Sequence, residues 1–205
     1  MPAQALELGT CGTPAEMTAW LKAEGHKMVA GMNRIGVSLK QGGHVGYAAD
    51  LVTATADFKR WYIIGGDRPL TERSTRMCVA AAGRNLEIND HRSKKRPTVT
   101  RYRFEHAKAL AECKKIEESY TGAKEYGLRC NAHDEVVRIL GEDTKGRIAL
   151  QGMTDQNTLM TILADPEKEK RYTLLATAPM GATTVAGGGK GYAFSGSILA
   201  RFAQR

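Results

Sequence analysis

Two stretches of the sequence open on a cysteine and then follow one pattern: CGTPAEMTAWL over residues 11–21 and CNAHDEVVRIL over residues 130–140. After the cysteine come a turn-like triplet, a glutamate, and apolar residues at the spacing of one buried helix face. Those apolar residues are Met17, Trp20 and Leu21 in the first stretch, and Val136, Ile139 and Leu140 in the second. Thr13 or Thr10, and likewise Asn131, are candidate N-caps of the helix. The match predicts two diverged copies of one small module.

Strand-like segments follow each predicted helix, and they also correspond between the copies. LVTATAD at 51–57 and WYII at 61–64 match LMTILAD at 159–165 and YTLL at 172–175, with a charged turn inside each pair. Aromatic and β-branched residues favour strands, and a charged connector suits a hairpin. A last strand, CVAAAG at 78–83, matches TVAGGG at 184–189. We therefore expect an α+β fold of two tandem modules, each one helix packed on a small antiparallel sheet.

A linker is expected to join the two modules. It begins with the basic segment RSKKRP at 92–97 and continues as an amphipathic helix over roughly 105–120, with Ala109, Leu110, Cys113 and Ile116 on its apolar side. We expect module one at 1–97, and module two, which includes the linker helix, at 98–205.

Taken together, these motifs resemble a family of small exported alphaproteobacterial proteins of unknown function. The resemblance is carried by Cys130 and Glu135, the two following strands and VAGG at 185–188, and in the first copy by Cys11, Glu16 and CVAA at 78–81. It covers both halves of the chain but not the linker. It implies export and a disulfide, and it implies no activity. The second copy departs from the family pattern, because Thr184 stands where the strand cysteine is expected.

Four cysteines allow three pairings. The first copy holds both an opening cysteine and a strand cysteine, so the repeat favours Cys11 with Cys78. Cys130 lacks that partner in its own copy and is expected to pair with Cys113 of the linker helix, which would stabilise the fold by roughly 3 kcal/mol. We expect both bonds to be structural, since the sequence has no Cys-x-x-Cys and no Cys/His cluster with zinc-ligand spacing.

The N-terminus and the composition bear on where the protein works. Residues 2–5, PAQA, are similar to a signal-peptidase site, so we expect a mature form with an added Met1 in the periplasm or outside the cell. If Met1 is the natural start, the protein is cytosolic and its cysteines are free thiols. No apolar run is long enough to span a membrane.

The sequence holds no motif from which we predict catalytic residues, a metal or a cofactor. It has no Gly-x-Ser-x-Gly, no Walker motif and no dinucleotide fingerprint. GGGKGY at 187–192 is expected in a hairpin turn rather than in a phosphate loop, because it lacks Gly-Lys-Ser/Thr. The five histidines are expected at surface or turn positions. They are His26, His44, His91, His106 and His133.

A net charge of +8 and a basic stretch beside aromatic residues indicate an anionic neighbour; the alternatives are a charge that serves solubility alone and a basic stretch that is a solvated linker. The basic stretch comprises Arg92, Lys94, Lys95, Arg96, Arg101 and Arg103. We expect a non-enzymatic exported binding or inhibitory module whose partner is an envelope protein or an anionic envelope surface. The alternatives are a hydrolase-type enzyme with a site between the modules, and a nucleic-acid binder that uses the basic stretch.

Overall fold

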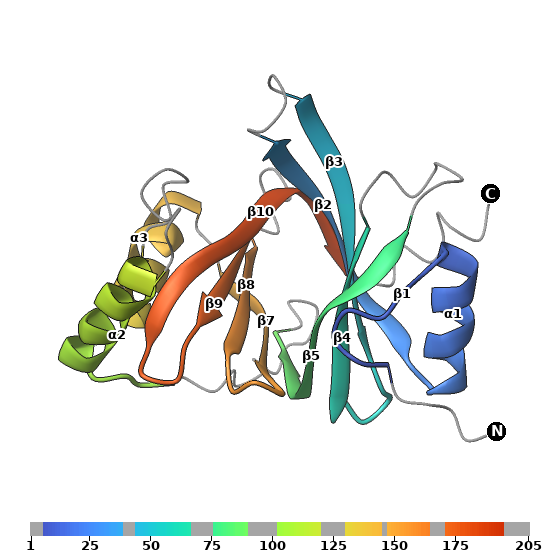
Figure 1. Ribbon diagram of the computed structural model, residues 1–205, viewed down its shortest axis with the longest axis horizontal. Helices are drawn as coiled ribbons and strands as arrows, with labels where there is room; N and C mark the ends of the chain where they lie inside the picture. The colour runs from blue at the N-terminus through green and yellow to red at the C-terminus, as the bar shows by residue number, and fades with distance from the viewer. Residues whose placement is uncertain are drawn as a thin grey trace. The chain divides into compact units, whose positions relative to one another are not determined.

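The computed structural model describes residues 6–38, 44–66, 76–89, 102–119, 130–144, 147–164 and 171–194. At 33–38, 44–49, 141–144, 147 and 187–194 it describes the backbone alone. These ranges contain three helices and ten strands (Figure 1). None of the three helices has the length and apolarity needed to cross a bilayer.

The strands join into one ten-stranded sheet of order β1-β5-β4-β3-β2-β10-β9-β8-β7, in which β6 pairs with β10 and β5 makes an additional pairing with β7. Their bounds are β1 (Cys11–Gly12), β2 (Lys27–Ser38), β3 (His44–Ala54), β4 (Arg60–Gly66), β5 (Met77–Ile88), β6 (Cys130–Ala132), β7 (Arg147–Thr154), β8 (Leu159–Ala164), β9 (Tyr172–Thr177) and β10 (Ala182–Phe194). The expected arrangement of two separate helix-on-sheet modules joined by a linker helix is therefore wrong, although the fold is α+β.

The prediction of two separate modules failed because it placed the ends of the strands wrongly. The glycine-rich segment 187–192, expected in a hairpin turn, lies inside β10. β10 begins beside β6, where Thr184 is opposite Cys130, and it ends beside β2, where Gly189 is opposite Arg34. An alternating sequence pattern shows which face of a strand is apolar, but it does not identify the neighbouring strand. The extension of β10 could therefore not be predicted from that pattern.

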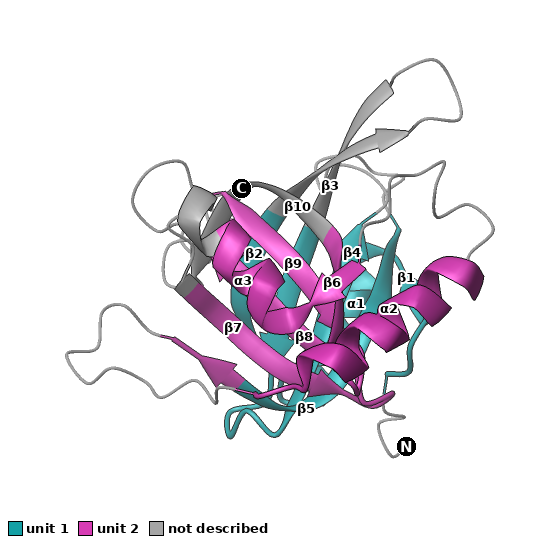
Figure 2. Cartoon of the chain, turned by 90° about the vertical axis from the view of Figure 1, so that its left-hand side faces the viewer, with its two compact units in different colours: residues 1–86, 189–205 teal, residues 87–188 magenta. Residues whose placement is uncertain are grey.

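The chain divides into two compact units, coloured in Figure 2. Unit 1 comprises residues 1–86 and 189–205, and unit 2 comprises residues 87–188. The module boundary expected near Pro97 falls outside the described residues. In chain order, a strand, a helix and four strands occur twice, first over residues 11–88 and again over residues 130–194.

In unit 1, helix α1 (Pro14–Ala23) packs on the sheet. Thr13 caps it in a capping box with Glu16, and Pro14 occupies its first turn. Met17 is buried in the core with Leu6, Tyr62, Ile64, Met77, Val79 and Ala82. Trp20, predicted to be buried, is 38% exposed and lies over Gly12 instead.

In unit 2, helix α2 (His106–Ser119) occupies much of the expected linker helix, and helix α3 (His133–Thr144) follows β6. α2 buries Ala109 and Cys113, whereas Leu110, expected on its apolar side, is 42% exposed. On α3, Ile139 is also exposed, in contrast to the expected buried position. The interior of unit 2 comes mainly from its strands, with Leu150, Leu159, Leu163 and Leu175 almost fully enclosed.

Candidate functional site: the anchored helix of unit 2 and two buried histidines

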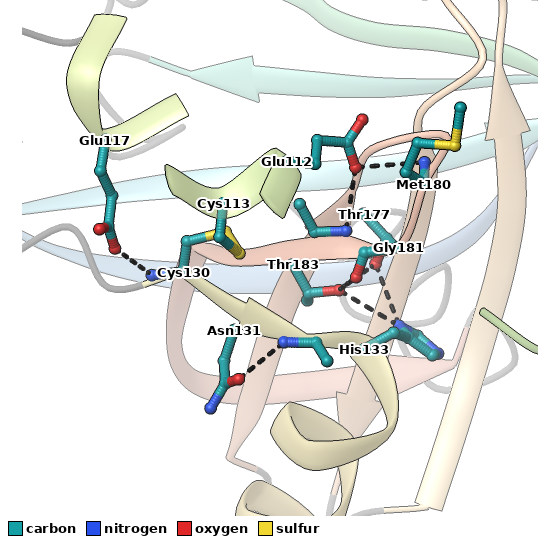
Figure 3. The surroundings of a disulfide bond; sticks show 12 residues. Glu112, Cys113, Glu117, Cys130, Asn131, His133, Thr177, Met180, Gly181 and Thr183 are labelled. Carbon is teal, nitrogen blue, oxygen red and sulfur yellow. Dashed lines mark hydrogen bonds between the residues drawn. A yellow bond between two sulfur atoms is a disulfide. The ribbon is translucent and has the colours of Figure 1, made fainter. Parts of the chain in front are cut away.

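Helix α2 is covalently joined to strand β6. Cys113, near the middle of the helix, forms a disulfide with Cys130, the first residue of β6 (Figure 3). The other disulfide joins Cys11 of β1 to Cys78 of β5 in unit 1. These are the two pairs named from the sequence. The cysteine positions decide what each bond holds: one joins two neighbouring strands, and the other holds a helix against a strand.

Two glutamates of α2 add polar contacts beside the disulfide. One Glu112 carboxylate oxygen accepts hydrogen bonds from the backbone N–H groups of Met180 and Ala182, both at 3.1 Å. Glu117 accepts a longer bond, 3.4 Å, from the N–H of Cys130. Hydrogen bonds to a carboxylate are stronger than those between neutral groups. Glu112 therefore fixes the turn between β9 and β10 against the helix.

Phe104, just before α2, packs over Gly181 in the same turn. Gly181 has a backbone φ of +100°, and a Cβ atom there would collide with the Phe104 ring. The ring also meets the His133 imidazole edge-on, with centroids 5.3 Å apart. Gly181 thus satisfies two requirements at once, a left-handed turn conformation and close approach of an aromatic ring.

His133 lies at the centre of a buried polar cluster beneath this turn. Its Nδ1 is 3.1 Å from the Thr177 hydroxyl and 3.4 Å from the Thr183 hydroxyl, and the two hydroxyls are 2.9 Å apart (Figure 3). Thr183 also donates to the carbonyl of Gly181. Burial lowers the pKa of His133, against the opposing effect of the Asp134 carboxylate. A neutral imidazole is therefore favoured in the folded protein.

Unit 1 also contains a buried histidine, His26, which has different partners. Its ring stacks on Tyr62 at 4.6 Å, and its Nδ1 is 3.3 Å from the Thr53 hydroxyl. Its Nε2 is 3.7 Å from a Glu24 carboxylate oxygen, which accepts a 3.0 Å hydrogen bond from the Tyr62 hydroxyl. Burial lowers the pKa of His26, Glu24 opposes the change, and Arg60 adds to it.

The chemistry open to these two histidines is limited by their enclosure. An imidazole beside a hydroxyl group is the arrangement that activates the serine nucleophile of some hydrolases. Here His26, Thr53, His133, Thr177 and Thr183 are all at most 9% exposed. In this conformation a substrate cannot reach them, so both clusters act on the stability of the fold. The expectation that all five histidines lie on the surface or in turns is thus wrong for His26 and His133, because each has a hydroxyl partner inside the protein.

The structure describes only some of the other residues singled out from the sequence. His106 is exposed on α2, His91 lies outside the described residues, and the side chain of His44 is not described. Of the basic stretch, only Arg103 is described, and it is exposed; Arg92, Lys94, Lys95, Arg96 and Arg101 lie outside. Within the described ranges, no group of three histidine, cysteine or acidic residues could hold a metal ion. Sequence reasoning missed Glu112, Phe104 and Gly181, since their partners lie about 70 residues away.

Comparison with known proteins adds no assignment. No family model, no curated protein and no solved structure matches the chain.

Proposed function

We propose that this chain is an exported, disulfide-stabilised binding protein with no catalytic role, whose sequence carries a diverged tandem repeat. The observation that carries the proposal is the state of the cysteines: both opening cysteines are engaged, and no cysteine is free. Stable disulfides are typical of proteins in oxidising compartments. The resemblance to small exported proteins points to the same location.

Exposed apolar side chains support a binding role. Trp20 on α1 is 38% exposed and Ile139 on α3 is 42% exposed. The two residues stand at the same distance from the opening cysteine of their stretch, nine positions after Cys11 and nine after Cys130. Aromatic and aliphatic anchors of this kind are typical of protein interfaces. We infer that each of these side chains, within its own unit, is a contact for a protein of the cell envelope.

Strand register supports the proposal of two copies. Cys11 of β1 is opposite Cys78 of β5, and Cys130 of β6 is opposite Thr184 of β10. In each half, the first residue of the opening strand is therefore paired with a residue of the last strand of that half. A shared register is what descent from one duplicated module would leave. The loss of one strand cysteine explains why Cys130 bonds to a helix outside the common pattern.

The proposal is tested by placing a photo-crosslinking amino acid at position 20 or position 139 of the full chain in living cells. We expect both positions to capture the same envelope protein, in competition with unlabelled purified protein. The exposed Lys114 on α2, 79% exposed, is the matched control position and should capture none of it. Capture that is equal at all three positions, or turnover of a substrate by the purified protein, would contradict the proposal.

The compartment is tested separately by intact-mass analysis after alkylation of the protein isolated from its native cells without reduction. We expect no alkylated cysteine. Four alkylated cysteines would place the protein in a reducing compartment and remove the basis for export.

A further inference from the structure

The N-terminal segment of unit 1 is held in place from Leu6 onward. Leu6 is 4% exposed and belongs to the hydrophobic core cluster of this unit. The N–H of Gly9 donates to the Val79 carbonyl of β5, and the Val79 N–H donates to the carbonyl of Thr10, both at 2.9 Å. Cys11 then bonds to β5 through its disulfide. The core contact and the pairing with β5 therefore fix where the Leu6 backbone nitrogen lies.

This nitrogen lies beside a partly enclosed carboxylate. It is 2.8 Å from Oε1 of Glu24, the C-cap residue of α1. The Glu24 side chain is 13% exposed, and its Oε2 accepts a 3.0 Å hydrogen bond from the Tyr62 hydroxyl of β4. One carboxylate thus connects the N-terminal segment, α1 and β4. A carboxylate removed from water to this extent is costly unless hydrogen-bond donors or a positive charge compensate it.

The titratable and charged groups around Glu24 are His26, Tyr62 and Arg60. Within the described ranges, the one ion-pair contact of Glu24 is with His26 Nε2, at 3.7 Å. Burial lowers the pKa of His26, which favours a neutral imidazole, and burial raises the pKa of Tyr62, which keeps the phenol protonated. The Arg60 guanidinium lies over the Tyr62 ring, 5.1 Å from its centroid. A positive charge on the Leu6 nitrogen would lie closer to the carboxylate than the His26 ring does.

The sequence immediately before Leu6 is Ala3-Gln4-Ala5. Small residues at the third and first positions before a bond form the pattern that signal peptidases cleave. Hydrolysis of the Ala5–Leu6 bond adds water across it, which leaves a carboxylate on Ala5 and an amino group on Leu6. An α-amino group has an ordinary pKa of about 7.7–8.0 and is mostly protonated at neutral pH. We propose that this bond is cleaved during export and that Glu24 binds the new α-ammonium group of Leu6.

The cleaved chain would hold an ion pair where the chain of residues 1–205 holds an amide hydrogen bond. In both forms the Leu6 nitrogen donates to Glu24, but only the cleaved chain brings a positive charge to the carboxylate. Hydrogen bonds between two charged groups have N–O distances of about 2.7–2.9 Å and are stronger than neutral ones. The observed 2.8 Å separation suits such a pair. The uncleaved chain therefore serves as a control in which only the charge is missing.

This inference rests on the proposed function, since signal peptidases act on exported chains. It is tested by the N-terminal peptide and the intact mass of the protein isolated from its native cells without reduction. We expect a chain that begins at Leu6, carries a free amino group and contains two disulfides. Disulfide-bonded protein that begins at any other residue overturns the inference and leaves export standing, whereas four free thiols remove the basis for export as well.

The role of the carboxylate is tested in the chain that begins at Leu6, through the pH dependence of acetylation of its α-amino group. Glu24→Gln should lower the pKa of that group by about one pH unit or more, because the amide keeps a hydrogen-bond acceptor and removes the charge. Glu7→Gln, which removes the same charge from the exposed neighbouring residue, should lower it by less than about 0.3 pH units. Equal changes in the two variants overturn the pairing. In the unsubstituted chain, the same pKa should be higher in the folded protein than in urea, and an equal or lower value also overturns the pairing.

Urea unfolding at pH 7 and pH 9.5 gives a second readout. The ion pair raises the pKa of the amino group in the folded state, so its stabilising effect is present below about pH 8 and declines as the pH rises through the folded pKa. The interval avoids the titrations of His26 and Tyr62, since the pKa of His26 is lowered and that of Tyr62 is raised. Glu24→Gln should lower the urea midpoint more at pH 7 than at pH 9.5 in the chain that begins at Leu6, and equally at both in the chain of residues 1–205. A loss that is independent of pH in both chains overturns the inference.

Discussion

In both units the opening strand pairs with a later strand in the same register, but its cysteine forms a disulfide with a different kind of partner. In unit 1 the opening cysteine, Cys11, bonds to Cys78, directly opposite it on the neighbouring strand. In unit 2 the residue opposite Cys130 is Thr184, and Cys130 bonds to Cys113 of α2. The residue opposite the opening cysteine is thus a cysteine in unit 1 and a threonine in unit 2, where the opening cysteine bonds to a helix. The comparison teaches that the same strand register can coexist with different disulfide partners, because register depends on backbone pairing and the disulfide on side chains.

The largest expected effect comes from removing each disulfide. The Cys11–Cys78 bond spans 67 residues and the Cys113–Cys130 bond spans 17. Replacing Cys11 and Cys78 by alanine should lower the free energy of unfolding by about 4 kcal/mol, and replacing Cys113 and Cys130 by alanine should lower it by about 3 kcal/mol. The first loss is larger because a disulfide that closes a longer loop removes more entropy from the unfolded chain. Urea unfolding monitored by circular dichroism measures both. A larger loss for the unit 2 pair would show that α2 contributes more than loop closure.

The second prediction restores the pattern of unit 1 in unit 2. Cys113→Ala combined with Thr184→Cys should form a disulfide between positions 130 and 184, and it should recover about 4 kcal/mol relative to Cys113→Ala alone. Non-reducing peptide mapping detects the bond, and hydrogen exchange detects faster opening of α2. Val185→Cys in place of Thr184→Cys is the control, because adjacent strand residues point to opposite faces. A bond at position 185 would show that the register is different.

The third prediction compares one glycine from each unit. Gly181→Ala should cost about 2–3 kcal/mol, because it strains a left-handed backbone and collides with Phe104. Gly12→Ala should cost less than about 1 kcal/mol, since its Cβ would lie 2.9 Å from the outer ring atom of a partly exposed Trp20 that can shift. The measurement is again the urea midpoint. Equal costs would mean that Trp20 is held as firmly as Phe104.

The smallest effect concerns pH, and it tests the buried histidine of each unit. Burial lowers the pKa of His26 and of His133 in the folded state. The unfolded chain therefore binds more protons below about pH 6.5, so stability is fully present above that pH and is lost as the pH falls. The slope for each histidine is at most about 1.4 kcal/mol per pH unit.

Unfolding free energies at pH 7.5 and 5.5 measure this dependence. His26→Asn and His133→Asn should each reduce the difference between the two pH values, and the double variant should reduce it most. Leu110→Asn, on the exposed surface of α2, carries no titrating group and is the control that should leave it unchanged. A pH dependence that survives in the double variant would assign it to other groups.

Local structure was predictable where a few neighbouring residues determine it. The Thr13 cap, the Glu16 capping box and the extent of α2 follow from residues within one or two helical turns. The partners of the buried residues could not be predicted from neighbouring residues. The Glu112 carboxylate and its two N–H donors are separated by 68 and 70 residues, and His133 and Thr177 by 44. No spacing rule connects residues that meet only after the sheet has formed.

The amino-acid sequence by itself indicated the helices, most strand segments and the cysteine pairs, because helices and strands depend on local periodicity and capping, and the pairs followed from the place of each cysteine in the repeated pattern. Only the tertiary structure decided that β10 continues through its glycine run, that one sheet contains all ten strands, and that His26 and His133 are enclosed. The physical reason is that strand neighbours and burial are set by contacts between distant segments. Alternation along one strand shows that a face must be covered, and the fold determines which segment covers it.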